Sequence, residues 1–167
     1  FMNDSPPTES YTLSLHAALP IATPEFYTKK LLAKTSTADQ LKNLWVSLRT
    51  EPIDWVRNFI YDCQGDAILS AYLLKVQESI NLHELNDIND ELFDKEFNTL
   101  KALKCMMNQK LGAERVRTDV NLYVNAVAGL LLSPRILTRK IAAESLTFMI
   151  AYYSRSEGGS DNQGKYH

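Results

Sequence analysis

Cysteine is scarce in this sequence, and the little that is present forms no metal-binding or disulfide pattern. The chain has 167 residues and two cysteines, Cys63 and Cys105, which stand far apart. No Cys-x-x-Cys pair occurs, and no cysteine lies at metal-ligand spacing from a histidine. Disulfide-rich secreted domains and zinc modules need such patterns. The sequence therefore predicts a reduced, intracellular protein with two buried thiols.

Long apolar runs and an excess of basic charge are also missing. No apolar segment approaches the ~18–20 residues that a membrane span requires. The mildly apolar residues 13–22 follow no basic region, so they do not resemble a signal peptide. Eighteen basic against 20 acidic residues give a net charge of −2 at pH 7, whereas nucleic-acid binding requires a basic surface. We therefore expect no membrane span and no nucleic-acid partner.

Catalytic motifs are absent as well. The sequence has no glycine-rich phosphate loop, no nucleophile elbow and no metal-binding motif. His83 is the one histidine inside the expected domain, and it lies in a polar, acidic stretch where a solvated side chain is the usual outcome. We expect no enzymatic activity, no metal and no cofactor.

What remains is a composition typical of a soluble globular domain. Hydrophobic residues make up 45% of the chain and charged residues 23%, which separates it from disordered sequences. The length suits one domain. We expect a disordered or artefactual leader over residues 1–22, the domain over residues 23–154 and a flexible tail over residues 155–167.

Residues 11–21 bear on the origin of the leader. They read YTLSLHAALPI and differ only at Ala17 from YTLSLHDALPI, the translation of a widely used sequencing adapter. We interpret them as adapter sequence. The alternative is a natural disordered tail, which Pro6 and Pro7 also fit. Amplification of this junction from genomic DNA distinguishes the two.

Helix-start signals divide the rest of the chain. Thr23, Pro24 and Glu25 combine a cap, a first-turn proline and an acidic residue at the positive end of the helix dipole. Thr37 and Gln40 have capping-box spacing, and Glu51-Pro52 opens a third helix that we expect to stop at Gly65. Apolar residues follow each signal at helical spacing.

The later segments continue this helical pattern. Residues 81–90 are polar and acidic and predict a loop. The further helices expected are residues 66–80, residues 90–110 with a stop at Gly112, residues 119–132, and a last helix that Ser133 and Pro134 open and that ends near Tyr153. No strand-rich segment interrupts them.

The sequence therefore predicts an all-α fold. Consecutive amphipathic helices favour an armadillo/HEAT-like helical repeat, a fragment of a right-handed solenoid. Leu100-x-x-Leu103 and Ala143-x-x-Leu146 lie 43 positions apart, within the ~40–47-residue period of such repeats. From this pattern alone an irregular helical bundle fits nearly as well.

Several segments resemble the amino-terminal regulatory region of Diaphanous-related formins. The most distinctive is VSLRTEPIDWVRNF at residues 46–59, and residues 24–31 look like the helix that precedes it in that family. Residues 100–112, LKALKCMMNQKLG, are similar to a formin segment with two adjacent asparagines, and residues 132–140 look most like fungal formins. The resemblance covers about residues 23–152.

The resemblance implies a non-catalytic GTPase-binding and inhibitory armadillo region. Its expected partners are a GTP-loaded Rho-family GTPase and the carboxy-terminal autoregulatory helix of the formin, which would bind antagonistically. Actin is reached only indirectly, through the rest of the formin, and the expected localisation is cytoplasmic, at the cytoskeleton and cell cortex. The alternative is a helical-repeat adaptor that binds a peptide helix whatever the nucleotide state of a GTPase.

The resemblance also implies the binding residues. Those within residues 100–112 are Lys104, Met107, Asn108 and Gln109. Those on the last expected helix are Arg139, Ala143 and Thr147. Gln109 stands where the family usually has a second asparagine, which puts one GTPase contact in doubt. The structural alternatives are that Asn108 only ends its helix, that Ala143 packs against a neighbouring repeat, and that Arg139 is merely solvated.

Two tryptophans offer a choice between an interface and the core. Trp45 and Trp55 each lie on an apolar stripe, so we expect both in the core. Arg49 lies between them and is expected to make structural hydrogen bonds or ion pairs.

Overall fold

The computed structural model describes residues 22–82 and 90–157, and every regular element in these two ranges is a helix. The α-helices are α2 (Pro24–Leu32), α3 (Ala38–Thr50), α4 (Ile53–Arg57), α5 (Gly65–Leu82), α6 (Asp90–Met107), α7 (Lys110–Val116), α8 (Val120–Ala128) and α9 (Ile136–Glu157). A π-helix, η1 (Asn58–Asp62), and two 3-10 helices, η2 (Arg117–Asp119) and η3 (Gly129–Leu132), connect them. The predictions for the adapter-like leader and for His83 lie outside the described residues.

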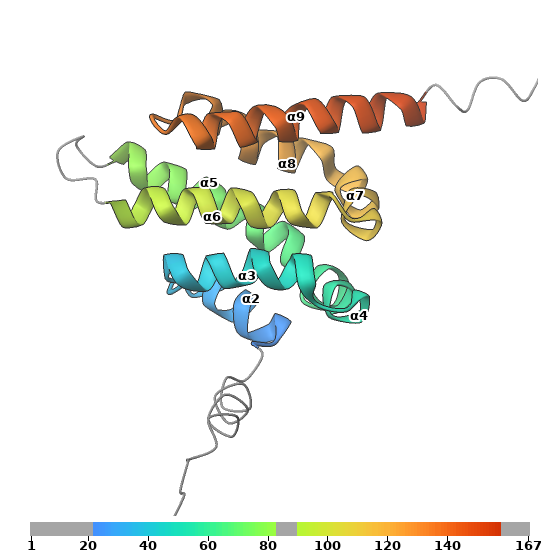
Figure 1. Ribbon diagram of the computed structural model, residues 1–167, viewed down its shortest axis with the longest axis horizontal. Coiled ribbons are helices and arrows are strands. Elements are labelled where there is room, and N and C mark those ends of the chain that lie inside the picture. The colour runs from blue at the N-terminus through green and yellow to red at the C-terminus, as the bar shows by residue number, and fades with distance from the viewer. Residues whose placement is uncertain (1–21, 83–89, 158–167) are drawn as a thin grey trace, which may run out of the picture.

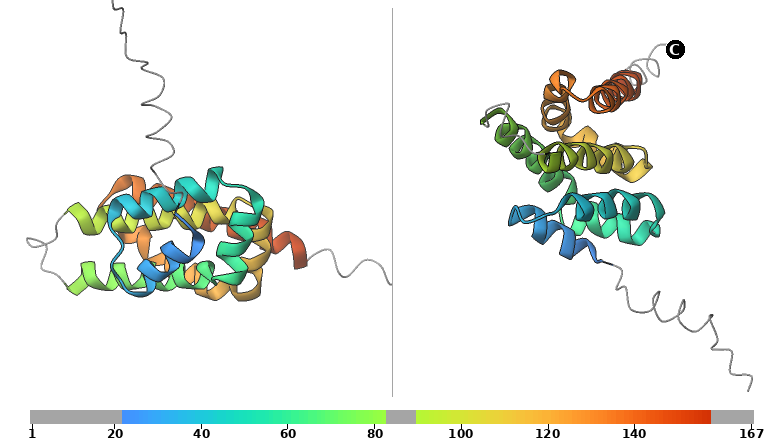
Figure 2. Two further views of the ribbon diagram at one scale, coloured as in Figure 1. Left: turned by 90° about the horizontal axis from the view of Figure 1, so that it is seen from below. Right: turned by 60° about the vertical axis from the view of Figure 1, so that its left-hand side comes forward.

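The helices form two stacked rows. Helices α3, α6 and α9 lie one above the other and make the front row, while α2, α5 and α8 make the rear row (Figure 1). Within the front row α3 packs on α6 and α6 on α9, and in the rear row α5 packs against both α2 and α8. Figure 2 gives the same layers from two other directions. This arrangement confirms the predicted all-α helical repeat.

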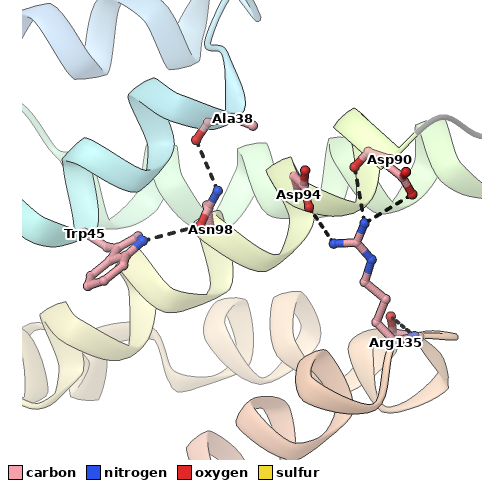
Figure 3. Close-up of polar contacts among 7 residues, drawn as sticks. Ala38, Trp45, Asp90, Asp94, Asn98 and Arg135 are labelled. Atoms are coloured by element: carbon pink, nitrogen blue, oxygen red, sulfur yellow. Dashed lines mark hydrogen bonds and ion pairs between the residues drawn. The ribbon is translucent and has the colours of Figure 1, made fainter.

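Polar contacts between α3 and α6 define their relative direction. The Ala38 backbone N–H donates to Glu91 Oε1 at 3.1 Å, and Trp45 Nε1 donates to Asn98 Oδ1 at 3.4 Å, each across 53 positions of sequence. Asn98 also donates from Nδ2 to the Ala38 carbonyl at 3.1 Å (Figure 3). Because the first two contacts share the same separation at two places along the helices, α3 and α6 run parallel.

Ion pairs likewise fix the position of α6 relative to α9 and to Arg135, the residue directly before α9. Asp94 pairs with Arg135 at 2.6 Å across 41 positions, and Lys104 pairs with Glu144 at 2.6 Å across 40 positions. These separations are close to the 43-residue spacing seen in the sequence, so α9 repeats the placement of α6 one layer further along.

The caps predicted from sequence are present at the first helices. Thr23 Oγ1 accepts from the Phe26 backbone N–H at 3.2 Å, and Thr37 with Gln40 forms a complete capping box. Pro52 occupies the N-cap position of α4. The local helix-start signals therefore operate as the sequence indicates.

The two glycines that the sequence predicts as helix stops have different positions, since Gly65 begins α5 whereas Gly112 lies inside α7. Gly65 is the first residue of α5, and the turn before it is made by Gln64, whose φ is 53°. A Cβ at Gly65 would lie 2.4 Å from the Phe59 ring, and one at Gly112, within α7, would lie 1.9 Å from the Met106 carbonyl oxygen. The helix before Gly65 therefore ends where predicted, although Gln64 and not the glycine adopts the left-handed conformation. The predicted stop at Gly112 is wrong, because this glycine permits close packing inside α7.

Helix ends differ from the sequence expectation in three further places. α6 ends at Met107 instead of Lys110, because the chain turns there and restarts as α7. The segment expected to be one helix over residues 119–132 is α8 followed by the 3-10 helix η3, with Asp119 as N-cap. α9 continues to Glu157, beyond Tyr153.

The core runs between the two rows. Leu44, Leu48, Phe59, Leu100 and Leu103 have no exposed side-chain surface, and complete burial of such a side chain is worth about 1.5–3 kcal/mol. The two tryptophans pack against this core but are only partly buried, so the prediction that they are core residues holds in part.

A buried polar cluster links the rear row to α7. Asp66 is 3% exposed and accepts at Oδ2 from the Tyr123 hydroxyl at 2.6 Å and from Arg115 Nε at 3.0 Å. Burial and this carboxylate raise the pKa of Tyr123, so its hydroxyl stays protonated as the donor. The charge of Asp66 is thereby compensated inside the fold.

Candidate functional site

The candidate residues on α6 separate into buried and displayed side chains. Met107 is 1% exposed and Leu103 has no exposure, which confirms that both face the core. Lys104 is partly exposed and Asn108 is exposed. The Asn108 side-chain amide makes no hydrogen bond to any residue in the described ranges. Asn108 therefore presents a free amide at the end of α6, while Met107 supports the helix from within.

Gln109 connects two helices of the front row. Its backbone carbonyl accepts from the Ala113 N–H at 2.9 Å at the start of α7. Its side-chain Nε2 donates to the Leu48 carbonyl of α3, one of the carbonyls that a helix end leaves without an internal partner. The amide of Gln109 is thus occupied in joining α3 to the α6–α7 corner, which is a structural role for the position where the family usually has asparagine.

A cleft opens at this corner. Its volume is about 390 Å³, and it is lined by Arg49, Glu51, Ile53, Cys105, Asn108 and Gln109. Ile53 is 52% exposed, so the cleft combines an apolar edge with amide and charged groups. Such a mixture of apolar contact and few convergent polar groups is typical of a protein-binding site.

The candidates on α9 occupy two different positions. Ala143 and Thr147 are exposed, one turn apart, and Thr147 Oγ1 donates to the Ala143 carbonyl at 2.8 Å. Arg139 lies nearer the start of the helix, where its Nη1 donates to the Ser133 carbonyl at 2.8 Å. Ala142, next to Ala143, is fully buried. The small exposed surface at Ala143 and Thr147 is open to a partner, whereas Arg139 holds the turn before α9.

One ion pair brings the α6 and α9 candidates together. Lys104 Nζ lies 2.6 Å from Glu144 Oε2, and Glu144 directly follows Ala143. The hydrogen bond and charge of Lys104 lower the pKa of Glu144, so the pair remains ionised at neutral pH. The structure therefore joins Lys104 to the neighbour of Ala143, while Met107 lies in the core beneath.

A cation–aromatic cluster that includes the cleft residue Arg49 was not predicted from the sequence. Arg49 stacks over the Trp45 ring at 5.7 Å, and Lys101 lies over the same ring at 3.9 Å. The i, i+4 spacing of Trp45 and Arg49 was visible in the sequence, but the approach of Lys101 from another helix was not. Burial raises the pKa of the Cys105 thiol, and the charges of Lys101, Arg49 and Lys104 act in the opposite direction.

Two classes of feature are absent from the described ranges. Residues 22–82 and 90–157 contain no group of three or more histidine, cysteine or acidic side chains placed to hold a metal ion. Within the same ranges, no helix has the length and apolar character needed to cross a bilayer.

The fold and the cleft define a helical-repeat binding module. The sequence matches the Diaphanous GTPase-binding domain family over residues 9–151, a range that begins inside the predicted leader. The chain belongs to this family, and it is a regulatory region of the Diaphanous-related formin type.

Fungal proteins are among its relatives. The chain is 37% identical over 137 residues to the cytokinesis protein sepA of Emericella nidulans, covering 81% of this chain and 8% of that protein. It is 32% identical over 133 residues to protein BNI1 of Saccharomyces cerevisiae and 33% identical over 134 residues to cell fusion protein fus1 of Schizosaccharomyces pombe. Each of these two matches covers 80% of this chain and 7% and 9% of the relative, respectively. The chain thus spans less than a tenth of the length of these relatives.

Proposed function

We propose that this chain binds an active Rho-family GTPase and the carboxy-terminal autoregulatory segment of its formin, and so controls actin filament assembly and actin cytoskeleton organisation at the cell cortex. The chain would act by binding alone, without catalysis. The observation that carries the proposal is the exposed, unbonded amide of Asn108 at the edge of the 390 Å³ cleft. It lies in the segment whose family resemblance points to the GTPase contact.

The geometry also supports antagonism between the two partners. Lys104 lies one turn before Asn108 and is paired with Glu144 beside Ala143. A GTPase at the cleft and a helix along α9 would therefore meet at the same ion pair. Negative coupling between two ligands is typically ~1–3 kcal/mol and is necessarily reciprocal. GTP dependence would come from the switch loops of the GTPase, which the γ-phosphate orders.

The test is a titration of the full 167-residue chain, checked for helicity by circular dichroism, with GTP-loaded and GDP-loaded Rho-family proteins. We expect at least tenfold tighter binding of the GTP form, about 1.4 kcal/mol. A peptide of the autoregulatory segment should weaken that binding in a competition titration. Equal binding of both nucleotide forms by a folded chain would contradict the proposal and favour a peptide-binding adaptor.

A further inference from the structure

A small cavity lies where the end of α5, the middle of α6 and the segment before α9 meet. Its volume is about 180 Å³, and Gln77, Glu96 and Ser133 are among the residues that line it. One buried water needs about 10–15 Å³ of such a volume, so the cavity has room for a ligand of several non-hydrogen atoms. Glu96 precedes the cleft residues Cys105 and Asn108, which places the cavity roughly 14–18 Å along α6 from the cleft.

Glu96 gives this cavity a carboxylate with one oxygen unmatched. Its side chain is 4% exposed, and within residues 22–82 and 90–157 its Oε1 has no hydrogen-bond partner. Ser133 supplies a hydrogen bond to the carboxyl group but leaves Oε1 without a donor. A buried acceptor that lacks a donor reduces stability. A ligand that donates to Oε1 would therefore be bound favourably.

A second acceptor comes from α5. Gln77 Nε2 donates to the Ala126 carbonyl at 2.7 Å, which leaves the amide oxygen of Gln77 as the end that can accept. This oxygen lies so close to Gly129 that a Cβ there would collide with it, and Gly129 also lines the cavity. Asn81, one turn further along α5, adds another amide to the lining. The cavity thus offers a carboxylate oxygen and amide oxygens to a donor.

The charges around the cavity favour a donor that is positively charged. Arg135 is the cation that acts on Glu96, but its guanidinium already pairs with Asp94 at 2.6 Å and with Asp90 at 3.6 Å (Figure 3). When ionised, the three carboxylates and this one guanidinium have a net charge of −2. Burial raises the pKa of Glu96, and a cation at Oε1 would oppose that shift by stabilising the ionised form.

The rest of the lining limits the kind of cation. Ile80, Leu132 and Pro134 form apolar walls, against which an alkyl chain buries apolar surface. Among the described lining residues Glu96 is the one acidic side chain, whereas a hard metal ion is usually held by several oxygen ligands. Because only one oxygen of Glu96 lacks a partner, the two-point pairing that a guanidinium prefers is not available. An ammonium, with three N–H donors, suits separate acceptors better.

We infer that this cavity is a binding site for a primary alkylammonium group, whose N–H donors reach Glu96 and Gln77 and whose alkyl stem lies against Ile80 and Leu132. The cavity is called the ammonium pocket below. Two sources present this chemistry, a lysine side chain of a partner protein and a free polyamine. The inference is independent of the proposed function, because the ammonium pocket is separate from the cleft that contains Asn108.

The test uses the full 167-residue chain and butylammonium as the probe. In ¹H–¹⁵N correlation spectra, butylammonium should shift the Gln77 side-chain amide and the Gly129 backbone amide in a saturable way, with a dissociation constant on the order of 1 mM. Tetraethylammonium has the same charge but no N–H donor, so it should bind at least tenfold more weakly. Nα-acetyl-lysine amide and spermidine then distinguish the two sources, because the tighter of the two shows which kind of ligand the pocket prefers.

Two variants and a control locate the effect. Glu96→Gln retains the size of the side chain but removes its charge, and it should weaken butylammonium binding at least tenfold. Asn81→Leu, at an exposed position of the lining, should weaken it about threefold and keeps the test valid if Glu96→Gln alters the fold. The matched control is Glu78→Gln, which removes a carboxylate from an exposed position of α5 outside the lining. The control should keep the wild-type affinity within twofold.

Three results would overturn the inference. These are equal affinity for butylammonium and tetraethylammonium, unchanged butylammonium binding by Glu96→Gln, and the absence of saturable shifts at Gln77 and Gly129, which would leave a cavity filled by water only. Each of them is distinguishable from failure of the proposed function. GTP-dependent binding of the GTPase is measured separately on the wild type, and Glu96→Gln should leave it unchanged within twofold.

Discussion

The two ends of the front row use charge in opposite ways. At the end where α6 begins, Arg135 bonds both Asp94, at 2.6 Å, and the Asp90 carbonyl, at 3.4 Å (Figure 3). At the end where α6 finishes, Arg49 and Lys101 stack on Trp45 and form no ion pair with a described residue. We call these the paired end and the open end.

The difference teaches how a repeat protein separates architecture from recognition. Opposite charges that meet across a seam hold neighbouring helices in register, and at the paired end Arg135 is occupied in this way. Charges and amides without an internal partner cost little at a partly exposed position, yet they remain available to a ligand. Asn108 lies at the same open end as Arg49 and Lys101, and this end is where we propose that the GTPase binds.

The largest loss of stability should follow from truncating a core side chain that lies beneath both ends. Leu103 has no exposed surface, so Leu103→Ala should lower the free energy of unfolding by about 2–5 kcal/mol. Urea denaturation followed by circular dichroism measures this. The stability of the paired end and partner binding at the open end should decrease together. A variant that loses less than about 1 kcal/mol would show that the two rows do not share one core.

The open end alone should respond to Asn108→Asp. We expect at least tenfold weaker binding of the GTP-loaded GTPase, about 1.4 kcal/mol, because the substitution removes an amide donor and adds a negative charge. The free energy of unfolding should change by less than about 0.5 kcal/mol, as for other exposed positions. Asn121→Asp, exposed on α8 in the rear row, is the matched control. Equal losses in both variants would argue against a specific contact.

The paired end should show the reverse outcome with Arg135→Ala. Loss of its bonds to α6 should lower the free energy of unfolding by about 1 kcal/mol, with GTPase and peptide affinities unchanged. Thermal unfolding and the same titrations provide the two measurements. Arg57→Ala serves as control, because Arg57 makes an exposed pair with Asp54 within a single turn. Weaker partner binding by Arg135→Ala would end the distinction between the two ends.

A smaller effect is expected at the ion pair between Lys104 and Glu144. Both side chains are partly exposed, at 33% and 45%, so a double-mutant cycle with alanine should give a coupling energy of about 0.2–1 kcal/mol. The coupling should fall in high salt. A coupling energy above about 2 kcal/mol would indicate that this ion pair stabilises the fold, as the contacts of Arg135 do.

The smallest effect concerns the pH dependence of Glu96, which is 4% exposed on α6. Burial raises its pKa, opposed by a hydrogen bond with Ser133 and the charge of Arg135. The folded chain therefore binds this proton more tightly than the unfolded chain. Its contribution to stability is complete below the unfolded pKa and falls as pH rises through the folded pKa. Glu96→Gln should reduce the decline of the free energy of unfolding with rising pH, measured by urea titrations at several pH values. An unchanged decline would show that other titratable groups cause it.

Local signals in the sequence were sufficient for much of the fold. The caps at Thr23 and Thr37, the proline before α4 and the apolar face of α6 each depend on residues a few positions apart, and each is confirmed. The prediction at Gly112 was wrong, because a glycine that ends a helix and one that admits a neighbouring group look alike in sequence. Only the proximity of the Met106 carbonyl shows which role Gly112 has.

The binding surface was predictable only in its α6 segment. The motif at residues 100–112 identified Lys104, Asn108 and Gln109 as candidates, and burial then separated them from Met107. The bond from Gln109 to the Leu48 carbonyl joins positions 61 residues apart, and no local pattern indicates it. The cluster of Arg49, Trp45 and Lys101 was missed for the same reason.

By itself, the sequence determined the helical class, the caps and the family, because these depend on short-range spacing and on a distinctive motif. The tertiary structure alone decided which charges are paired and which are left open. That outcome depends on the parallel register of α3, α6 and α9, which brings side chains 40 to 53 positions apart into contact. Packing between distant segments sets this register, and the same packing placed Lys101 over Trp45 while leaving Asn108 free.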